Sequence, residues 1–442
     1  MKILIGAILI LAGSIMASSA HADALWLCRN LPSAALATED APVRSHVYGL
    51  DGSVTLLQAG SRPATPQDCD SKPLPDETKP LWVGFLPPGA PPARQVILQG
   101  NDRGQGFQVS EVSVETGGSE PSPAAAPAAM PDGGPDSKSA AAPARTAWFW
   151  SPAAWLDTPE LIFQQAATHK LGRVYITVLL RDGVVAHAEA LGDFIVAARS
   201  HGLSVWAVLG DPAAVIPDQQ IVLAGLAAGL AEYNRHAEAG RRLEGLQLDV
   251  EPYLLPGYQL QPAAWQQRYV ETVQRVHEAA PELPLDLAMP YWWGEPQHGG
   301  SDLLDRLQPS IQGITVMDYR TDFDDIVRFA QPFLDWGARA ERRIAIAIER
   351  MPIDDEERRV YARDSRGELW QTQLAGKDVL VLFDRPVAAV DGSVFRYSRS
   401  AKFFGGTVSF SSQVDRLSTL LPQLEQVFVR WPSFSSIALH GL

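Results

Sequence analysis

The chain has 442 residues, of which 34 are Pro and 35 are Gly, and 46% of its residues are hydrophobic. This composition is typical of a globular protein, and the length indicates two or three domains. The formal net charge of −14 and the lack of a Lys/Arg-rich run argue against a nucleic-acid partner and against an anionic-membrane surface. Two cysteines in so long a chain exclude a Cys-rich metal site.

The first residues, Met1–Ala22, have the features of a secretory signal peptide. Lys2 gives a positive start, residues 3–12 are apolar, and Ala20-His21-Ala22 fits the small-residue rule for cleavage. The alternative is a membrane anchor, but the uninterrupted apolar run is shorter than the roughly 20 residues that cross a bilayer. No later run is long enough to span. We therefore expect a periplasmic or secreted protein without a membrane span after cleavage.

Residues 23–116 are predicted to form a small β domain. Asp51-Gly52 lies between two strand-like runs and indicates a hairpin, because this dipeptide tolerates the positive φ angles of a tight turn. An oxidising compartment allows Cys28 and Cys69 to form a disulfide in this domain, the alternative being two free buried thiols. Further strands are expected at residues 81–86, 94–99 and 107–115.

Residues 117–146 are rich in Pro, Ala, Gly and Ser. Such a segment lacks the apolar side chains that offset the entropy of ordering, so we interpret it as a flexible to extended linker.

Residues 147–442 alternate short, β-branched apolar runs with amphipathic helical stretches. This alternation predicts a parallel sheet covered by helices. Seven repeats fit a closed (β/α)8 barrel better than an open sheet. The predicted strands are residues 147–150, 173–180, 203–210, 245–253, 283–293, 313–319 and 343–349.

Two segments qualify as the eighth strand, residues 405–410 and residues 435–441. If the first closed the barrel, the second would have no partner. We therefore favour residues 435–441, which makes residues 414–429 the seventh helix and residues 353–410 an insertion in the barrel.

The fourth predicted strand ends in two acids. Side chains alternate along a strand, so Gln247, Asp249 and Glu251 share the inward face, at the end of the barrel where strand carboxyl termini meet and chemistry takes place. Two carboxylates in a dry site resist ionising together, so at least one pKa should rise. Glu251, nearest the mouth, is the candidate general acid. The alternative is a structural carboxylate pair held by Arg or backbone donors.

Two further strands end in polar side chains. Met317 and Tyr319 share one face of the sixth strand, and Tyr319 is either a donor to a substrate carbonyl or carboxylate or a packing residue. Glu349 ends the seventh strand. It is either a second catalytic carboxylate or an ordinary strand-end residue paired with Arg350 or Arg320.

Aromatic residues near the predicted mouth suit the apolar faces of sugar rings, although packing is the alternative. They are Trp148, Trp150, Tyr253, Tyr291, Trp292 and Trp293. With Gln247 and Met317, all but Trp148 form the predicted substrate-binding set. Asp182, Asp211 and His440 are weaker rim candidates.

No cofactor or metal is expected. The nine His show no HExxH-type spacing, no Gly-rich loop suggests a nucleotide, and no G-x-S-x-G elbow of a serine hydrolase occurs.

The fourth strand, Glu244 to Glu251, resembles the Asp-Gly-x-Asp-x-Asp-x-Glu motif of chitinase-like family 18 glycoside hydrolases. The Gly and the final Asp-x-Glu match, whereas Glu244 and Gln247 replace the first two Asp. The Met-x-Tyr-Asp motif of the sixth strand has Arg320 at its last position, and the fifth-strand Ala-x-Pro is present as Ala288 and Pro290.

The resemblance implies hydrolysis of a polysaccharide with N-acetylated sugars. Glu251 would protonate the leaving oxygen, Asp249 would orient the substrate's 2-acetamido group as the nucleophile, and Tyr319 would steady the acetamido oxygen. One alternative is a retaining glycosidase in which Glu251 and Glu349 act about 5–5.5 Å apart. Another, motivated by the replaced motif acids, is a non-catalytic glycan-binding or scaffold protein of an export system.

Overall fold

The computed structural model describes residues 24–29, 43–48, 50, 53–60, 69–75, 78–86, 93–102, 107–115, 144–255, 258, 261–388 and 391–442. The predicted signal peptide, the Asp51-Gly52 turn and residues 117–143 of the predicted linker lie outside the described residues. Within the described ranges, no helix has the length and apolar character needed to cross a membrane.

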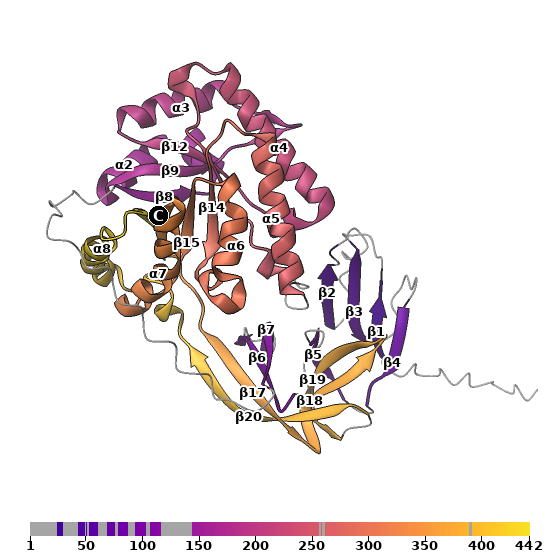
Figure 1. Ribbon diagram of the computed structural model, residues 1–442. Helices are drawn as coiled ribbons and strands as arrows, with labels where there is room; N and C mark the ends of the chain where they lie inside the picture. The colour runs from indigo at the N-terminus through magenta and orange to yellow at the C-terminus, as the bar shows by residue number, and fades with distance from the viewer. Residues whose placement is uncertain are drawn as a thin grey trace, which may run out of the picture.

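Eight parallel strands close into a barrel in the second part of the chain, with helices around it (Figure 1). The last strand pairs in parallel with both the seventh and the first, so the predicted closing segment, residues 435–441, is confirmed. The other candidate begins instead with the 3-10 helix η9 (Gly405–Thr407). In chain order the strands are β8 (Arg145–Phe149), β9 (Leu171–Thr177), β12 (Ser204–Leu209), β13 (Leu246–Leu248), β14 (Leu285–Pro290), β15 (Gly313–Met317), β16 (Arg343–Glu349) and β21 (Phe434–His440).

The outward faces of the strands pack against helices. Leu246, Leu248 and Val250 all belong to the large core between strands and helices, as the alternation of side chains requires. Several of these helices begin with Pro at the first helical position, where its missing N–H leaves no hydrogen bond unmade. The helices are α1 (Pro152–Leu156), α2 (Pro159–His169), α3 (Ala188–Ser200), α4 (Pro217–His236), α5 (Pro262–Ala279), α6 (Gly300–Leu307), α7 (Phe323–Ala340) and α8 (Val414–Phe428).

The inside of the barrel is filled by side chains rather than left as a pore, as is usual for this fold. An inner cluster contains Trp148, Tyr175 and Trp206, with smaller residues around them. Below it, near the amino ends of the strands, Arg173 donates to Asp286 at 3.0 Å and lies 4.1 Å from the Trp206 ring centre. These contacts fill the barrel near its amino-terminal end, and in barrels of this kind chemistry takes place at the carboxyl-terminal mouth.

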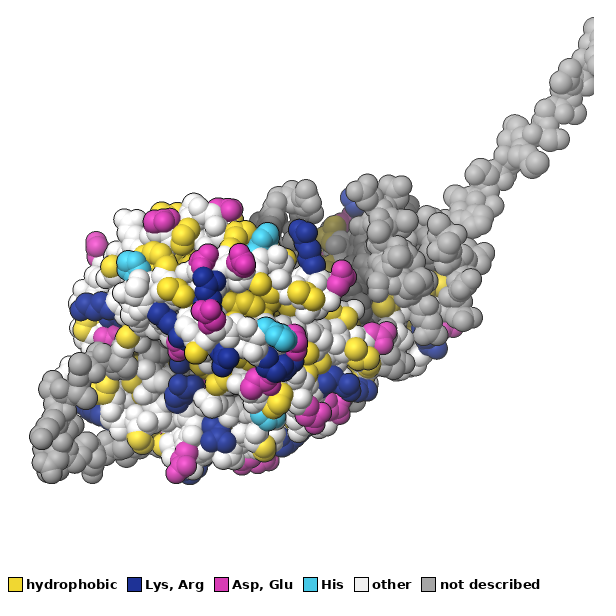
Figure 2. Space-filling view, turned by 90° about the horizontal axis from the view of Figure 1, so that it is seen from above, with side chains coloured by type: hydrophobic (Ala, Val, Ile, Leu, Met, Phe, Trp, Pro, Cys, Tyr) yellow, Lys and Arg dark blue, Asp and Glu magenta, His cyan; other side chains and the backbone are white. Residues whose placement is uncertain are grey.

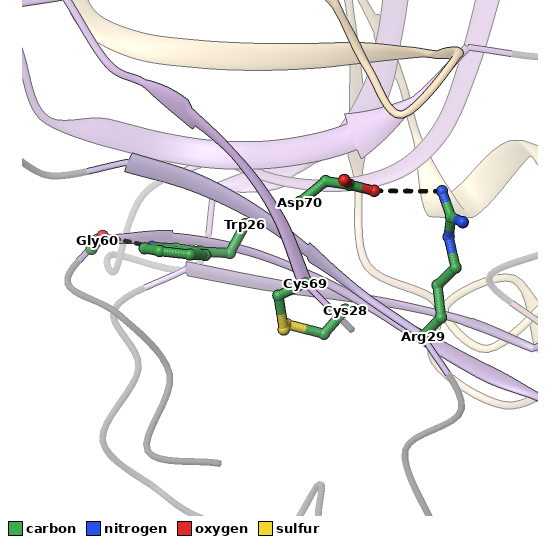
Figure 3. The surroundings of a disulfide bond; sticks show 6 residues. All are labelled: Trp26, Cys28, Arg29, Gly60, Cys69 and Asp70. Atoms are coloured by element: carbon green, nitrogen blue, oxygen red, sulfur yellow. Dashed lines mark hydrogen bonds and ion pairs between the residues drawn. A yellow bond between two sulfur atoms is a disulfide. The ribbon is translucent and has the colours of Figure 1, made fainter. Parts of the chain in front are cut away.

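A four-stranded antiparallel sheet, here called the first sheet, lies in the predicted β domain in the order β2-β3-β1-β4. The predicted hairpin strands β2 and β3 pair with each other. Cys28 of β1 lies opposite Cys69 of β4, and the two form the predicted disulfide (Figure 3). The strands are β1 (Ala24–Cys28), β2 (Val43–Tyr48), β3 (Val54–Gly60) and β4 (Cys69–Pro73).

A seven-stranded sheet, here called the second sheet, combines early strands of the chain with strands of the insertion in the order β5-β19-β18-β20-β17-β6-β7. Its strands come from the first 115 residues and from the insertion, and hydrophobic residues of the first sheet pack on it. Within this sheet β17 and β20 run side by side and extend toward the barrel (Figure 1). The strands are β5 (Pro80–Phe85), β6 (Gln95–Asp102), β7 (Phe107–Glu115), β17 (Glu356–Asp364), β18 (Arg366–Leu374), β19 (Lys377–Ala388) and β20 (Ser393–Phe403).

The barrel surface carries charges of both signs. Figure 2 shows Lys and Arg side chains interspersed with Asp and Glu on the face seen from above. Across the described ranges, no group of three or more His, Cys, Asp or Glu side chains is arranged to hold a metal ion.

Candidate active site

The backbone of β13 brings its acids to the barrel mouth. Asp249 follows the strand directly, and its N–H still donates to the carbonyl of Leu209 at 2.9 Å, so the ladder with β12 extends to this residue. A side chain at Gly210 would meet the Asp249 carbonyl oxygen at 2.0 Å. Glycine at position 210 therefore allows the close approach that fixes Asp249 at the end of the strand.

Gln247 lies one inward position below Asp249 and is fully buried. Its carbonyl oxygen accepts a hydrogen bond from Trp148 Nε1 at 2.6 Å, and its amide donates to Thr315 Oγ1 at 3.0 Å. These bonds tie β13 to β8 and β15 across the barrel. Gln247, predicted to bind substrate, is thus a buried link between strands and has no surface that a substrate can reach.

Asp249 and Glu251 form an electrostatically coupled pair. Burial, together with the nearby Glu251 carboxylate, raises the pKa of Asp249 from 3.8 to about 7, and no described group forms a hydrogen bond with its Oδ1. Burial also raises the pKa of Glu251, against the opposing effect of a hydrogen bond from the Tyr253 hydroxyl to its Oε2. The pair therefore tends to retain one proton near neutral pH.

Tyr319 lies in the electrostatic field of these acids. Burial raises the pKa of its phenol well above the usual range, and the charges of Glu349, Asp249 and Glu251 raise it further. Tyr319 therefore stays protonated and can donate a hydrogen bond at any physiological pH. Its ring also packs against the inner cluster, so the two roles weighed from the sequence, donor and packing, are compatible.

Glu349 is engaged by groups other than those expected. Its Oε2 faces His440 Nδ1 at 2.7 Å, and its Oε1 accepts the backbone N–H groups of Arg350 and Met351. Burial opposes ionisation, but these bonds hold the pKa of Glu349 below its usual range. The expected salt bridge to the side chain of Arg350 or Arg320 does not form, since Glu349 pairs with His440 and Arg320 reaches the Tyr291 hydroxyl.

His440 is the site residue that sequence reasoning undervalued. Trp150 Nε1 donates to its Nε2 at 3.0 Å, which assigns the ring proton to Nδ1, facing Glu349. Its ring stacks on that of Tyr319, with 6.0 Å between centres. Although burial lowers its pKa, Glu349 and then Asp249 and Glu251 raise it above the ordinary value. His440 thus connects Glu349 to the acid pair.

The predicted aromatic set separates into two groups. Trp150 is 41% exposed, and Tyr253, Tyr291 and Trp292 are partly buried around the mouth, with Trp292 at 4.9 Å from Tyr253. Trp293 is fully buried instead, where its indole N–H donates to Tyr258 at 3.2 Å. Trp293 has no face for a sugar, because the 3-10 helix η6 (Tyr291–Gly294) turns it toward the core. Met317, which belongs to the predicted substrate-binding set but is not aromatic, is also buried, with 7% of its surface exposed.

Fold and site together define a (β/α)8 barrel with a carboxylate pair at its carboxyl-terminal mouth. No protein-family profile and no curated protein sequence matches the chain.

Several solved structures are similar to the chain. A family GH18 chitinase from Cycas revoluta in complex with (GlcNAc)3 is 10% identical with a TM-score of 0.37, covering 67% of this chain and 94% of that one. A GH18 chitinase from Pseudoalteromonas aurantia is 13% identical with a TM-score of 0.37 over the same shares. The glycoside hydrolase domain of a PelA variant from Pseudomonas aeruginosa is 15% identical with a TM-score of 0.31, covering 48% of this chain and 85% of that one. Our assignment of the barrel rests on the strand pairing of the chain itself.

Proposed function

We propose that the protein is an exported glycoside hydrolase that acts on a polysaccharide containing N-acetylated sugars. The observation that carries the proposal is the buried Asp249–Glu251 pair at the barrel mouth, where burial raises the pKa of both carboxyl groups. A carboxyl group that stays protonated at working pH is the requirement for a general acid. The neutral donor Tyr319 within the field of the same pair adds support.

In this proposal the reaction begins with protonation of the glycosidic oxygen by Glu251, held in place by Tyr253. The carbonyl oxygen of the substrate's 2-acetamido group attacks the anomeric carbon as the glycosidic bond breaks. Asp249, which is ionised when the proton of the pair lies on Glu251, accepts a hydrogen bond from the acetamido N–H and orients the group, and Tyr319 donates to the acetamido oxygen. Water then opens the cyclic intermediate with Glu251, now ionised, as the base.

The rival two-carboxylate reaction uses Glu349 as the nucleophile. The lowered pKa of Glu349 favours it, since a nucleophile must be ionised. The environment of Glu349 opposes it, because the residue is 4% exposed and both oxygens already accept hydrogen bonds. We therefore assign Glu349 the role of holding His440.

Export is the remaining part of the proposal. The disulfide between Cys28 and Cys69 supports it, because such bonds persist in oxidising compartments and are rare in the cytosol. Detection of the mature chain in a periplasmic or culture fraction, beginning after Ala22, tests this part directly.

The activity is tested by measuring reducing-end release from chitin oligosaccharides, peptidoglycan glycan and other bacterial polysaccharides. We expect cleavage of N-acetylated polymers only, and a loss of roughly 10²–10⁴-fold in Glu251→Gln, which retains shape without a transferable proton. Glu278→Gln, on the exposed side of α5, is the matched control. Cleavage of plain glucans contradicts substrate assistance. Glycan binding without release of reducing ends, with equal binding by the wild type and Glu251→Gln, indicates the non-catalytic alternative.

A further inference from the structure

The strand β20 is positively charged, whereas the chain as a whole is negatively charged. It contains Arg396, Arg399 and Lys402 but no acid, in a protein whose formal net charge is −14. Residues 396–403 are exposed, including Tyr397 at 45% and Phe403 at 44%. A basic strand with exposed aromatic side chains has the composition of an anionic-ligand surface.

Strand pairing gathers part of this charge over a small cavity. Arg358 of β17 lies opposite Ala401, and Val360 lies opposite Arg399, so both arginines share one face of the second sheet. They line a cavity of about 180 Å³ together with Phe403. Val360 and its neighbour Ile97 of β6, both buried, form an apolar floor beneath the two guanidinium groups.

The two guanidinium groups in this cavity are unpaired. Elsewhere on the two strands Arg359 pairs with Glu357 at 2.9 Å and Arg396 pairs with Asp364 at 3.8 Å. In the described part of the chain, neither Arg358 nor Arg399 forms an ion pair or a hydrogen bond.

The acid that shares their face is also engaged elsewhere, since Glu356 accepts a hydrogen bond from Gln99 Nε2 at 2.6 Å. The side chains that line the cavity therefore include two planar donors and the Ser400 hydroxyl but no carboxylate, which suits an anionic carboxylate ligand.

The two strands that carry the cavity are joined to the barrel mouth through short, hydrogen-bonded segments. Only residues 350–355 separate β16 from β17, and the N–H of Phe410 donates to the Glu349 carbonyl at 2.9 Å. Gly405 donates to Asp355 Oδ1 at 2.9 Å, which holds the end of β20 beside the start of β17. Arg399 is four residues from the end of β20, or about 13 Å along the strand.

We propose that this cavity binds the carboxylate of an acidic sugar in the polymer whose N-acetylated unit occupies the barrel mouth. The substrate class is then a polysaccharide that contains both uronic acid and N-acetylhexosamine. Arg358 and Arg399 bind the carboxylate, and Phe403 provides an apolar wall for the sugar ring. The assignment of the polymer as substrate rests on the proposed function, whereas binding of the acidic sugar does not.

The test is binding of the full chain to hyaluronan, an alternating polymer of uronate and N-acetylglucosamine, with neutral chitin oligosaccharides for comparison. We expect Arg358→Gln with Arg399→Gln to weaken hyaluronan binding about tenfold or more and to leave binding of the neutral oligosaccharides unchanged. The matched control is Arg366→Gln with Arg385→Gln, which removes the same charge from exposed positions of the second sheet. Thermal unfolding of each variant checks that it is folded.

The outcomes separate this inference from the proposed function. Equal weakening by both double variants, or none by either, overturns the carboxylate site. Cleavage of chitin oligosaccharides with no preference for the acidic polymer also overturns the inference while the proposed function stands. Arginine-dependent hyaluronan binding without cleavage of any N-acetylated polymer supports the carboxylate site and contradicts the proposed function.

Discussion

The raised pKa of Asp249 predicts that this residue destabilises the folded protein at neutral pH. The folded state holds the proton up to a pKa of about 7, whereas the ordinary value is 3.8. Folding stability from this group is therefore fully present below about pH 4 and is lost as the pH rises toward 7. A difference of about three pKa units at 1.36 kcal/mol each corresponds to about 4 kcal/mol.

Asp249→Asn removes this titration, and we expect the variant to gain about 4 kcal/mol relative to the wild type between pH 4 and pH 8. Any cost of burying the new amide is independent of pH and cancels in this difference. The measurement is urea unfolding at several pH values, monitored by tryptophan fluorescence. Asp157→Asn, at an exposed position, is the control.

The same experiment in a Glu251→Gln background apportions the effect. Removal of the neighbouring charge should shrink the pH-dependent gain without abolishing it, because burial is the larger cause of the shift. Parallel pH profiles for the wild type and Asp249→Asn would refute the reasoning, since they would mean that Asp249 is already ionised at acidic pH or is well solvated.

Two further predictions concern the polar network and the disulfide. Glu349→Gln should lower the pKa of His440, because the hydrogen bond and the charge of Glu349 raise that pKa. An NMR titration of the His440 ring measures it, and Glu295→Gln is the control. An unchanged pKa of His440 in Glu349→Gln would contradict this prediction. Cys28→Ser with Cys69→Ser should destabilise the first sheet by about 4 kcal/mol, because the bond closes a loop with a sequence separation of 41. Wild-type protein in reductant should then unfold like the double variant, and an unchanged unfolding temperature would count against the entropic estimate.

The barrel and the acid pair could be predicted because their signals are local. Each strand is a short apolar run of the chain, and alternation alone separates the inward Gln247 from the outward Leu246 and Leu248. The choice of the last strand needed one more argument, that a strand without a partner is unstable. The roles of Asp249 and Glu251 as catalytic groups stay a proposal.

What the sequence did not reveal depends on contacts between distant residues. His440 is 91 residues from its partner Glu349, and no local pattern marks either as half of a pair. Trp292 and Trp293 are adjacent, and only Trp293 is buried; because a 3-10 helix replaces the predicted strand there, strand alternation could not show which of the two faces the core. The pairing of β6 with β17 and of β5 with β19 could not be read from strand propensity, which is silent on partners.

The second sheet has a consequence for how the protein folds after synthesis. Residues 80–115 emerge before the barrel, but the partners of β5 and β6 in the middle of the sheet, β19 and β17, come from residues 356–403. The early strands must therefore wait, with open hydrogen-bonding edges, until most of the barrel has left the ribosome or the export channel. A chain released before residue 403 keeps those edges available for aggregation.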